Sequence, residues 1–311
     1  MCGINGVIAF TDKGLSSLDR IEEATNCLVN RGPDNLGIFR DHKIAFGHTR
    51  LSIIDTSDSA SQPMHDSSSR YTIIFNGEFF NFKEHREFVL SQGIKLKSES
   101  DTEVLLHLYI LEGEKCLERI NGFFAFAIYD KTQQSVFIAR DRIGIKPLLY
   151  FHDQDRLLFS SELKSLMAMG VPRDLDQASI FTYLQLNYIP GPNSIFKGVR
   201  KLMPGHSITI DLKKPDPLVE EKKYYEIPLP DDGGKGELAS GSYLQQQQKF
   251  RELLEASVKR RLIADVPLGT FLSGGIDSSV ITSIAAKHTE RLRTFSIGFK
   301  DEPRFDETKY A

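Results

Sequence analysis

Short apolar runs separated by polar breaks dominate the first two-thirds of the chain. Four of these runs are rich in β-branched and aromatic residues and have the length of strands, at 43–48, 71–76, 123–129 and 135–139. A polar segment at 130–134, between the last two runs, has the length of a hairpin loop. The pattern therefore predicts β-sheets in this part of the chain.

A helix is expected between residues 100 and 113. The sequence Ser-Asp-Thr-Glu at 100–103 has the form of a capping box, in which the serine and the glutamate bond each other's backbone N–H groups. Apolar residues follow at helical spacing up to Leu111, and Gly113 closes the segment. Together with the strands, this helix predicts an α+β fold.

The chain changes character between residues 212 and 241. Prolines and the pair Gly233-Gly234 stand there among charged residues, which is typical of a linker or surface excursion. We therefore expect one domain at 2–211, a connection at 212–241 and a second domain at 242–311. In the second domain, apolar residues at helical spacing from Phe250 to Leu262 predict a helix, and the run 266–272 predicts a short buried strand.

Composition and charge limit the classes of partner. The 311 residues are 40% hydrophobic and 26% charged with a net charge of −3, which is an ordinary balance for a globular protein. This charge argues against nucleic acid or an anionic membrane as the main partner, so small ligands are expected. Cys2, Cys27 and Cys116 are too few and too widely spaced for a disulfide framework or a zinc site. No apolar stretch approaches the roughly 18 residues of a membrane span, and a cytoplasmic location is expected.

Cys2 follows the initiator methionine, so removal of Met1 would place a thiol and a free α-amine on one residue. The amine has an ordinary pKa of about 7.7–8.0 and can take the thiol proton directly or through a water. Read alone, a cysteine at position 2 is usually an accident of sequence. Its meaning therefore depends on motifs elsewhere in the chain.

A glycine-rich loop at 273–279 lies between the predicted strand and a helical stretch at 280–287. Its sequence Ser-Gly-Gly-Ile-Asp-Ser-Ser allows backbone N–H groups to approach an anion at a helix N-terminus, and the serines add hydroxyl donors. The loop has no lysine and so does not match the phosphate-gripping loop of NTPases. The alternative interpretation is a flexible Gly-Ser turn.

Several motifs together resemble known families. The loop at 273–279 is similar to the SGGxDS loop of the ATP pyrophosphatase superfamily, and the amino-terminal motifs resemble class II glutamine amidotransferases. Both together resemble glutamine-hydrolysing asparagine synthetases over essentially the whole chain. The amino-terminal motifs are Cys2-Gly3-Ile4, Arg31-Gly32-Pro33-Asp34, Gly47-His48-Thr49-Arg50-Leu51-Ser52-Ile53, Asn76-Gly77-Glu78, Ser100-Asp101-Thr102-Glu103 and the segment from Ala139 to Leu148.

The resemblance implies a glutaminase site in a four-layer αββα N-terminal-nucleophile hydrolase sandwich. Cys2 would attack the glutamine amide, and Asn76 and Gly77 would stabilise the oxyanion, at about 3–4 kcal/mol for each donor. Glutamine would be bound by Arg50, Leu51, Ser52, Ile53, Ile54, Asn76, Gly77, Glu78 and Asp101. Arg50 would hold the α-carboxylate, while Asp101 and the 76–78 segment would receive the α-ammonium group.

Each of these residues also has a purely structural interpretation. Arg50 could form a surface ion pair, Asp101 could favour a helix N-terminus, and Asn76-Gly77 could be only a turn. The Arg31-Gly32-Pro33-Asp34 turn is as plausibly structural as catalytic, so Arg31 and Asp34 are not counted among the catalytic residues.

For the second domain the resemblance implies an α/β parallel-sheet ATP-pyrophosphatase domain that is incomplete here. Ammonia would pass through an internal channel to a site where aspartate and ATP with Mg²⁺ form β-aspartyl-AMP, giving asparagine, AMP and pyrophosphate. No organic prosthetic group is implied, and Asp277 would lie beside the Mg²⁺. The expected ATP-binding residues are Leu272, Ser273, Gly274, Gly275, Asp277, Ser278, Ser279 and Ile297, the last in the next parallel strand.

After the connection the chain supplies two predicted strands and ends at Ala311, so we expect the chain as given to be competent only as a glutaminase. The missing synthetase half would lie on the same or another chain, and a fragment, a truncated gene and a split enzyme all fit. The acceptor specificity and oligomeric state stay open, with a homodimer as one arrangement.

Three alternatives remain beside this reading. A sugar-phosphate or phosphoribosyl amidotransferase would share only the first domain, and the loop at 273–279 argues against it. A specialised glutamine-dependent amide or lactam synthetase would share both domains. A non-enzymatic regulator on an inactive amidotransferase fold is disfavoured by the intact motif residues.

Overall fold

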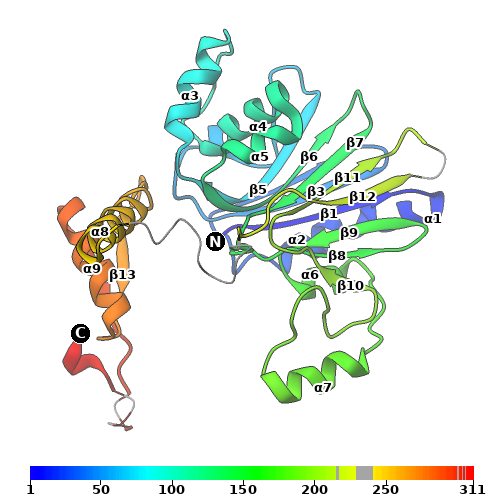
Figure 1. The fold of residues 1–311 in the computed structure, drawn as a ribbon. Coiled ribbons are helices and arrows are strands. Elements are labelled where there is room, and N and C mark those ends of the chain that lie inside the picture. The colour runs from blue at the N-terminus through cyan, green and yellow to red at the C-terminus, as the bar shows by residue number, and fades with distance from the viewer. Residues whose placement is uncertain (215–216, 229–240, 300, 303, 305) are drawn as a thin grey trace. The chain divides into compact units, whose positions relative to one another are not determined.

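The computed structural model describes residues 1–214, 217–228, 241–299, 301–302, 304 and 306–311. They form two compact units, Met1–Glu226 and Ile227–Ala311, and each is described by itself (Figure 1). Of the stretch expected to be a connection, residues 215–216 and 229–240 lie outside the described residues. The described part of that stretch contains a strand, Leu218–Lys223, which pairs within the first unit.

One antiparallel sheet of the first unit has β1 near its centre. Its strand order is β10-β8-β9-β1-β3-β2. Every residue of β1 is buried, and its partners β3 and β9 are antiparallel to it, with Gly3 opposite Thr49. This register brings Cys2, just before β1, next to the end of β3. The strands are β1 Gly3–Ala9, β2 Asn35–Arg40, β3 Ile44–Arg50, β8 Leu149–His152, β9 Arg156–Ser160 and β10 Val199–Lys201.

The second antiparallel sheet has the order β12-β11-β7-β6-β5-β4. The four strands expected from the apolar runs are confirmed, as β3, β5, β6 and β7, and β6 and β7 form the expected hairpin. The strands of this sheet are β4 Met64–His65, β5 Tyr71–Phe79, β6 Gly122–Asp130, β7 Ser135–Arg140, β11 His206–Asp211 and β12 Leu218–Lys223.

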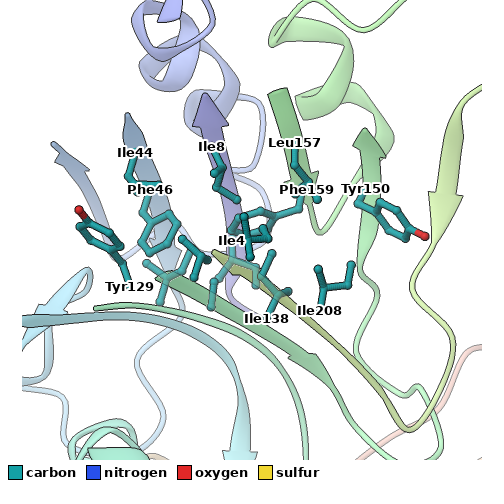
Figure 2. Packing of buried hydrophobic residues seen from close by; sticks show 14 of the residues in the cluster. Ile4, Ile8, Ile44, Phe46, Tyr129, Ile138, Tyr150, Leu157, Phe159 and Ile208 are labelled. Carbon is teal, nitrogen blue, oxygen red and sulfur yellow. The ribbon is translucent and has the colours of Figure 1, made fainter. Parts of the chain in front are cut away.

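The two sheets pack face to face around a core of aliphatic and aromatic side chains. Ile8, Phe46 and Phe159 of the first sheet and Ile138 of the second are fully buried. Figure 2 shows these side chains pointing into the space between the strands. Full burial of such a side chain contributes about 1.5–3 kcal/mol, so this interface stabilises the unit strongly.

Helices cover the outer faces of both sheets. On the first sheet, Ile21 and Ala24 of α2 and Leu166 of α6 pack with Val7 and Ala45. On the second sheet, the ring of Tyr109 in α4 stacks on Phe137, with centroids 5.3 Å apart. The helices are α1 Asp12–Leu15, α2 Ile21–Asn26, α3 Phe82–Ser91, α4 Asp101–Glu112, α5 Cys116–Arg119, α6 Leu163–Ala168 and α7 Gln177–Leu186. The layers confirm the expected αββα sandwich.

The helix expected after Ser100 is α4, with Gly113 as its C-cap. Ser100 Oγ accepts the Thr102 N–H at 3.0 Å, so Ser100 is the N-cap. The capping box itself is wrong, because the Glu103 carboxylate accepts the N–H groups of Lys97, at 2.9 Å, and Ser98, at 2.7 Å. Glu103 therefore fixes the loop that precedes Asp101, the first residue of α4.

The second unit contains a short parallel sheet with two helices. Its elements are α8 Tyr243–Lys259, β13 Gly269–Phe271, α9 Ile276–His288 and β14 Arg293–Phe295. The strands β13 and β14 are parallel and α9 joins them, as expected. The expectation that the first strand is buried is wrong, since Phe271 is 79% exposed. None of the helices among the described residues is long and apolar enough to cross a membrane.

Candidate functional site

A pocket of about 110 Å³ in the first unit contains Cys2 and every expected glutamine-binding residue except Ser52. Ser52 instead donates its N–H to Asp34 Oδ2, at 2.8 Å, and supports the chain beside the pocket. The lining residues come from the ends of β1 and β3, from β5, from the start of α4 and from two loops. They are Met1, Cys2, Arg50, Leu51, Ile53, Ile54, Ala60, Gln62, Phe75, Asn76, Gly77, Glu78, Ser100, Asp101, Thr102 and Lys146.

Cys2 is held at the start of the central strand by contacts to its backbone and its sulfur. Arg31 Nε donates to the Cys2 carbonyl at 2.8 Å, and the same guanidinium pairs with Glu162 at 3.1 Å. The Leu51 N–H points to Cys2 Sγ at 3.4 Å. Arg31, in the turn 31–34, therefore fixes the backbone of Cys2, whereas the sequence left open whether this turn is structural or catalytic.

The surroundings of Cys2 shift the pKa of its thiol and that of the N-terminal amine. Burial raises the pKa of the Cys2 thiol above its ordinary value, while the Leu51 N–H and the nearby N-terminal charge oppose this shift. Burial also lowers the pKa of the N-terminal amine, here that of Met1. In this environment a thiol gives up its proton only to a group close by, and an amine with a lowered pKa is a better-populated free base at neutral pH.

The side chain of Asn76 is buried against the pocket without a partner. It is 1% exposed, and neither Oδ1 nor Nδ2 has a hydrogen-bond partner among the described residues. A buried polar group left unpaired costs about 1–3 kcal/mol, so this amide is poised for a ligand. The next residue, Gly77, cannot carry a side chain, because a Cβ there would lie 2.5 Å from the Phe123 carbonyl oxygen.

Asp101 places a carboxylate in the pocket wall, at the first residue of α4. It is 5% exposed, and its Oδ2 accepts the Phe79 N–H at 3.0 Å. Burial raises the pKa of Asp101 to about 6, and the nearby Glu78 adds to this shift. A buried carboxylate in this condition is suited to a cationic group of a ligand.

Arg50 binds the loop that follows β3. Its guanidinium donates to the carbonyls of Ser57, at 2.8 Å, of Ile54, at 3.4 Å, and of Asp55. The expected contact with a glutamine carboxylate stays a prediction. In this structure Arg50 fixes the carbonyls of Ile54, Asp55 and Ser57, and of these residues Ile54 lines the pocket.

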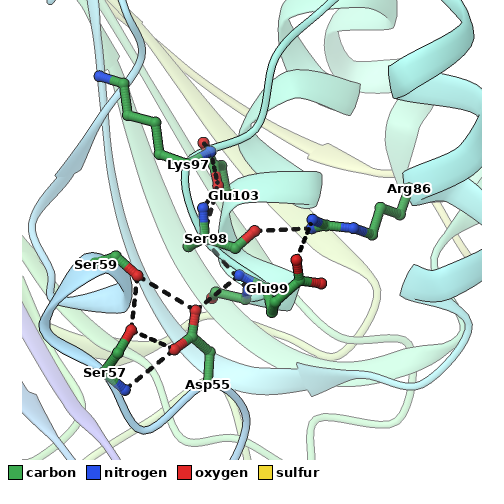
Figure 3. A network of polar contacts seen from close by, with 9 residues as sticks. Asp55, Ser57, Ser59, Arg86, Lys97, Ser98, Glu99 and Glu103 are labelled. Carbon is green, nitrogen blue, oxygen red and sulfur yellow. Dashed lines mark hydrogen bonds and ion pairs between the residues drawn. The ribbon is translucent and has the colours of Figure 1, made fainter.

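Asp55 ties the same loop to the segment before α4. Its Oδ2 accepts the Glu99 N–H at 2.7 Å, and its Oδ1 accepts the Ser57 N–H at 3.1 Å (Figure 3). Arg86 in turn binds the Ser98 carbonyl at 2.8 Å. The network joins the loop carrying Ile53 and Ile54 to the residues that position Asp101.

Gln62 and Lys146 are two of the pocket residues that the expected site did not include. Gln62 Oε1 accepts the Phe75 N–H at 2.6 Å, and its Nε2 donates to Thr102 Oγ1 at 3.2 Å, so it joins β5 to α4. No pattern around Gln62 points to this contact. Lys146 lies in the motif 139–148, where a lysine directly before Pro147-Leu148 is the one signal that could have identified a buried cation.

A cavity of about 310 Å³ in the second unit is lined by three of the eight expected ATP-binding residues. Leu272, Ser273 and Ile297 line this cavity, whereas the other expected ATP residues do not. Those others form the loop and first turn of α9: Gly274, Gly275, Asp277, Ser278 and Ser279.

The loop itself is closed by its own hydroxyls. Ser278 Oγ lies 3.1 Å from Ser273 Oγ, and Ser279 Oγ donates to the Gly275 carbonyl at 2.8 Å. Gly274 has a φ of 82°, a conformation that favours glycine. In the described part of the chain, no group of three or more His, Cys, Asp or Glu residues could hold a metal ion.

Comparisons with known proteins agree over both units. A model of the glutamine amidotransferase domain matches residues 1–225, and a model of asparagine synthase matches residues 249–311. Asparagine synthetase [glutamine-hydrolyzing] 3 of Bacillus subtilis is 35% identical over 314 residues, which are 98% of this chain and 49% of that protein. A putative asparagine synthetase [glutamine-hydrolyzing] 2 of Methanocaldococcus jannaschii is 36% identical over 333 residues, 100% of this chain and 62% of that protein.

One further relative has a name other than asparagine synthetase, and one solved structure has a similar fold. A Penicillium rubens protein named amidase chyE is 33% identical over 296 residues, 92% of this chain and 43% of that protein. A solved structure described as the allosteric regulatory enzyme of purine biosynthesis has a TM-score of 0.52 at 17% identity, over 96% of this chain and 66% of that chain. This likeness shows the fold alone. The chain spans about half the length of the curated relatives it matches.

Proposed function

Because the chain belongs to the glutamine amidotransferase domain family, we propose that it hydrolyses glutamine at Cys2 once Met1 has been removed. One observation carries this proposal. The pocket joins Cys2 to the unpartnered buried amide of Asn76 and to the buried carboxylate of Asp101. A nucleophile, an oxyanion donor and a site for an ammonium group are the three parts that the reaction needs.

The reaction proceeds through a thioester on Cys2. The freed α-amine takes the thiol proton, and Sγ attacks the side-chain amide carbon of glutamine. Asn76 Nδ2 and the Gly77 N–H donate to the oxyanion, at about 3–4 kcal/mol for each donor. Collapse of the intermediate breaks the C–N bond, and ammonia leaves with the proton held by the amine. Water then attacks the thioester, releasing glutamate and restoring the thiol.

The two ends of glutamine are recognised by opposite charges. Arg50 and the loop 51–54 take the α-carboxylate, while Asp101 and Glu78 take the α-ammonium group. Alanine variants of Arg50 and Asp101 should therefore lose kcat/KM for glutamine mainly through a raised KM. Wild-type kinetics in either variant would remove that residue from the site.

For the whole protein we infer glutamine-dependent asparagine formation, with aspartate and ATP·Mg²⁺ as the other substrates and AMP and pyrophosphate as products. The match of residues 249–311 to asparagine synthase supports this inference, as do the names of the relatives. The loop 273–279 would bind the nucleotide, with Asp277 beside Mg²⁺, and no organic prosthetic group takes part. We place the protein in the cytoplasm. A homodimer is one arrangement of the whole protein, and a measurement of its molecular mass in solution tests it.

A second candidate is a glutamine-dependent amide or lactam synthetase with another acceptor. This candidate is motivated by a relative at 33% identity that is named amidase chyE and not asparagine synthetase. Competition between aspartate and other carboxylates, with pyrophosphate release as the measurement, separates the two candidates.

The 311-residue chain alone is expected to release glutamate without aspartate-dependent pyrophosphate, because Phe271 and Phe295 beside the nucleotide cavity are 79% and 56% exposed. Stoichiometric pyrophosphate and asparagine from this chain would contradict that expectation.

The nucleophile is tested by glutamate release from glutamine. Mass spectrometry should find the purified chain beginning at Cys2. Cys2→Ala, or an N-terminal tag that blocks removal of Met1, should abolish glutamate formation, whereas Cys27→Ala, the matched cysteine control outside the pocket, should retain it. Unchanged glutaminase activity in Cys2→Ala would refute the proposal.

A further inference from the structure

The motif 139–148 has no part in the proposed reaction, yet it is built around one lysine. The carboxylate of Asp141 accepts four backbone N–H groups, those of Phe124, Ile143, Ile145 and Lys146, at 3.2, 3.1, 2.9 and 3.0 Å. Asp141 is 1% exposed. This arrangement anchors the loop to β6 and fixes the backbone at position 146.

Arg140 fixes the other side of the same loop. Its Nε donates to the Lys146 carbonyl and its Nη2 to the Gly144 carbonyl, both at 2.7 Å, while Nη1 reaches the Leu202 carbonyl. Gly144 has a φ of 73°, which a residue with a side chain rarely adopts. Both the N–H and the carbonyl of Lys146 are therefore held by charged side chains.

The Lys146 side chain points from this support into the glutaminase pocket. The residue is 4% exposed and lines the pocket together with Cys2 and Glu78. Its Nζ lies 4.5 Å from the centroid of the Phe123 ring, and no hydrogen bond or ion pair joins Nζ to another residue in the described ranges. Burying a cation without a bonded anion lowers the stability of a fold, and such groups occur preferentially at functional sites.

We propose that Lys146 is a positioning residue of this site, a fixed positive charge that favours the Cys2 thiolate and an unprotonated α-amine. This inference rests on the proposed glutaminase function. A positive charge stabilises the anion of the thiol and disfavours a second cation on the amine, so it promotes both halves of the nucleophile–base pair. The motif 139–148 supplies the precision of placement that such an effect needs.

Other charges near Cys2 and the N-terminal amine also shift the pKa values of these two groups, some upward and some downward. Arg31, from the turn 31–34, adds to the effect of Lys146 on the amine, and Asp101 raises the pKa of the thiol. Burial lowers the pKa of Lys146, while Glu78 and Cys2 act to raise it, and Asp141 does so more weakly. Lys146 lowers the pKa of the Cys2 thiol, against the effect of burial, and it also lowers the pKa of the Met1 amine, which is the N-terminal amine before Met1 is removed.

The test is the pH dependence of Cys2 alkylation by iodoacetamide, followed by mass spectrometry on the processed full chain. This readout needs no glutamine turnover. Lys146→Met should move the midpoint of the alkylation rate upward by about one pH unit, so that alkylation is about tenfold slower below the midpoint. Lys146→Arg, which keeps the charge, should restore the wild-type midpoint, and Lys146→Gln provides a second neutral variant if Lys146→Met does not fold.

A matched control separates charge from packing. Phe123→Leu removes the aromatic ring beside Nζ but keeps the lysine, so its midpoint should stay at the wild-type value. A shifted midpoint in the neutral variants together with a wild type that makes no glutamate would support the role of Lys146 and refute the proposed function. An unshifted midpoint in both neutral variants would overturn the inference, whatever their glutaminase activity.

Discussion

Asp101→Asn removes a charge that the fold buries and that glutamine would pair. The carboxylate is 5% exposed at the first residue of α4, and burial raises its pKa from 3.8 to about 6. A group with a raised pKa in the folded state stabilises the fold below its unfolded pKa, and this contribution is lost as pH rises through the folded value. At pH 8 the ionised Asp101 therefore destabilises the unliganded protein.

The size of this effect follows from the shift. Two pH units at about 1.36 kcal/mol each give about 3 kcal/mol as an upper estimate for the cost at pH 8. For a unit of this size, about 1 kcal/mol corresponds to roughly 2–4 °C in Tm. Asp101→Asn should therefore raise Tm by several degrees at pH 8 and change it little at pH 3.5. The amide can still accept the Phe79 N–H, which in the wild type lies 3.0 Å from Oδ2.

The same variant should lose recognition of glutamine. A hydrogen bond to a charged group contributes about 1.5–3 kcal/mol, so kcat/KM should fall about 10- to 100-fold at pH 8. In the wild type, protonation of Asp101 should add about a tenfold fall in kcat/KM between pH 7 and pH 5. The variant should lack this part and keep only the fall that protonation of the α-amine base causes.

Thermal denaturation and glutamate release over pH 3.5–8 measure both effects. Asp58→Asn, which removes an exposed carboxylate, is the control and should change neither. A lowered Tm at pH 8, or an unchanged decrease in kcat/KM between pH 7 and pH 5, would refute the reasoning about Asp101.

Three further predictions concern the support of the pocket. Asp55→Ala should raise the KM for glutamine about tenfold with a smaller change in kcat, because it releases the bond to the Glu99 N–H. Ser59→Ala is the control, since Ser59 Oγ lies 3.5 Å from Asp55 Oδ2 and makes only a weak contact there. Equal KM values in the two variants would contradict the role of the network. His48 is fully buried and burial lowers its pKa from 6.5 to about 3, so its stability contribution is complete above pH 6.5 and is lost toward pH 3. His48→Gln should therefore reduce the pH dependence of urea denaturation between pH 4 and 6.5 by up to about 1.4 kcal/mol per unit, and an unchanged slope would exclude His48 as the cause. Gly77→Ala should abolish glutamate release and lower Tm, since its Cβ would approach a backbone oxygen to 2.5 Å; a wild-type Tm would show that the strand can adjust.

Two pocket residues stand next to elements that the sequence predicted. Asn76 lies in β5, which an apolar run predicts, and Asp101 begins α4, which a helix cap predicts, whereas β1, directly after Cys2, was not predicted. Such local patterns determine where an element starts and hence where its neighbouring side chain projects. Their roles in binding glutamine remain predictions.

Contacts between loops could not be predicted in the same way. Gln62 reaches the Phe75 N–H and Thr102 from an irregular segment, so its place depends on how β5 and α4 are packed. The exposure of Phe271 has a similar origin. The run 266–272 has the composition of a buried strand, but β13 pairs with β14 in a sheet of two strands, and burial depends on what covers that sheet.

The unliganded pocket combines two features that a fold optimised for stability alone would avoid. Asn76 has a buried amide without a partner, and Asp101 has a buried carboxylate with a raised pKa. Glutamine offers an oxygen to the first and an ammonium group to the second, so binding would relieve both costs. The two contacts differ in their effect on rate. The ammonium group stays the same throughout the reaction, whereas the amide oxygen becomes an oxyanion that accepts a stronger hydrogen bond. Asn76 should therefore act mainly on the transition state and Asp101 on binding.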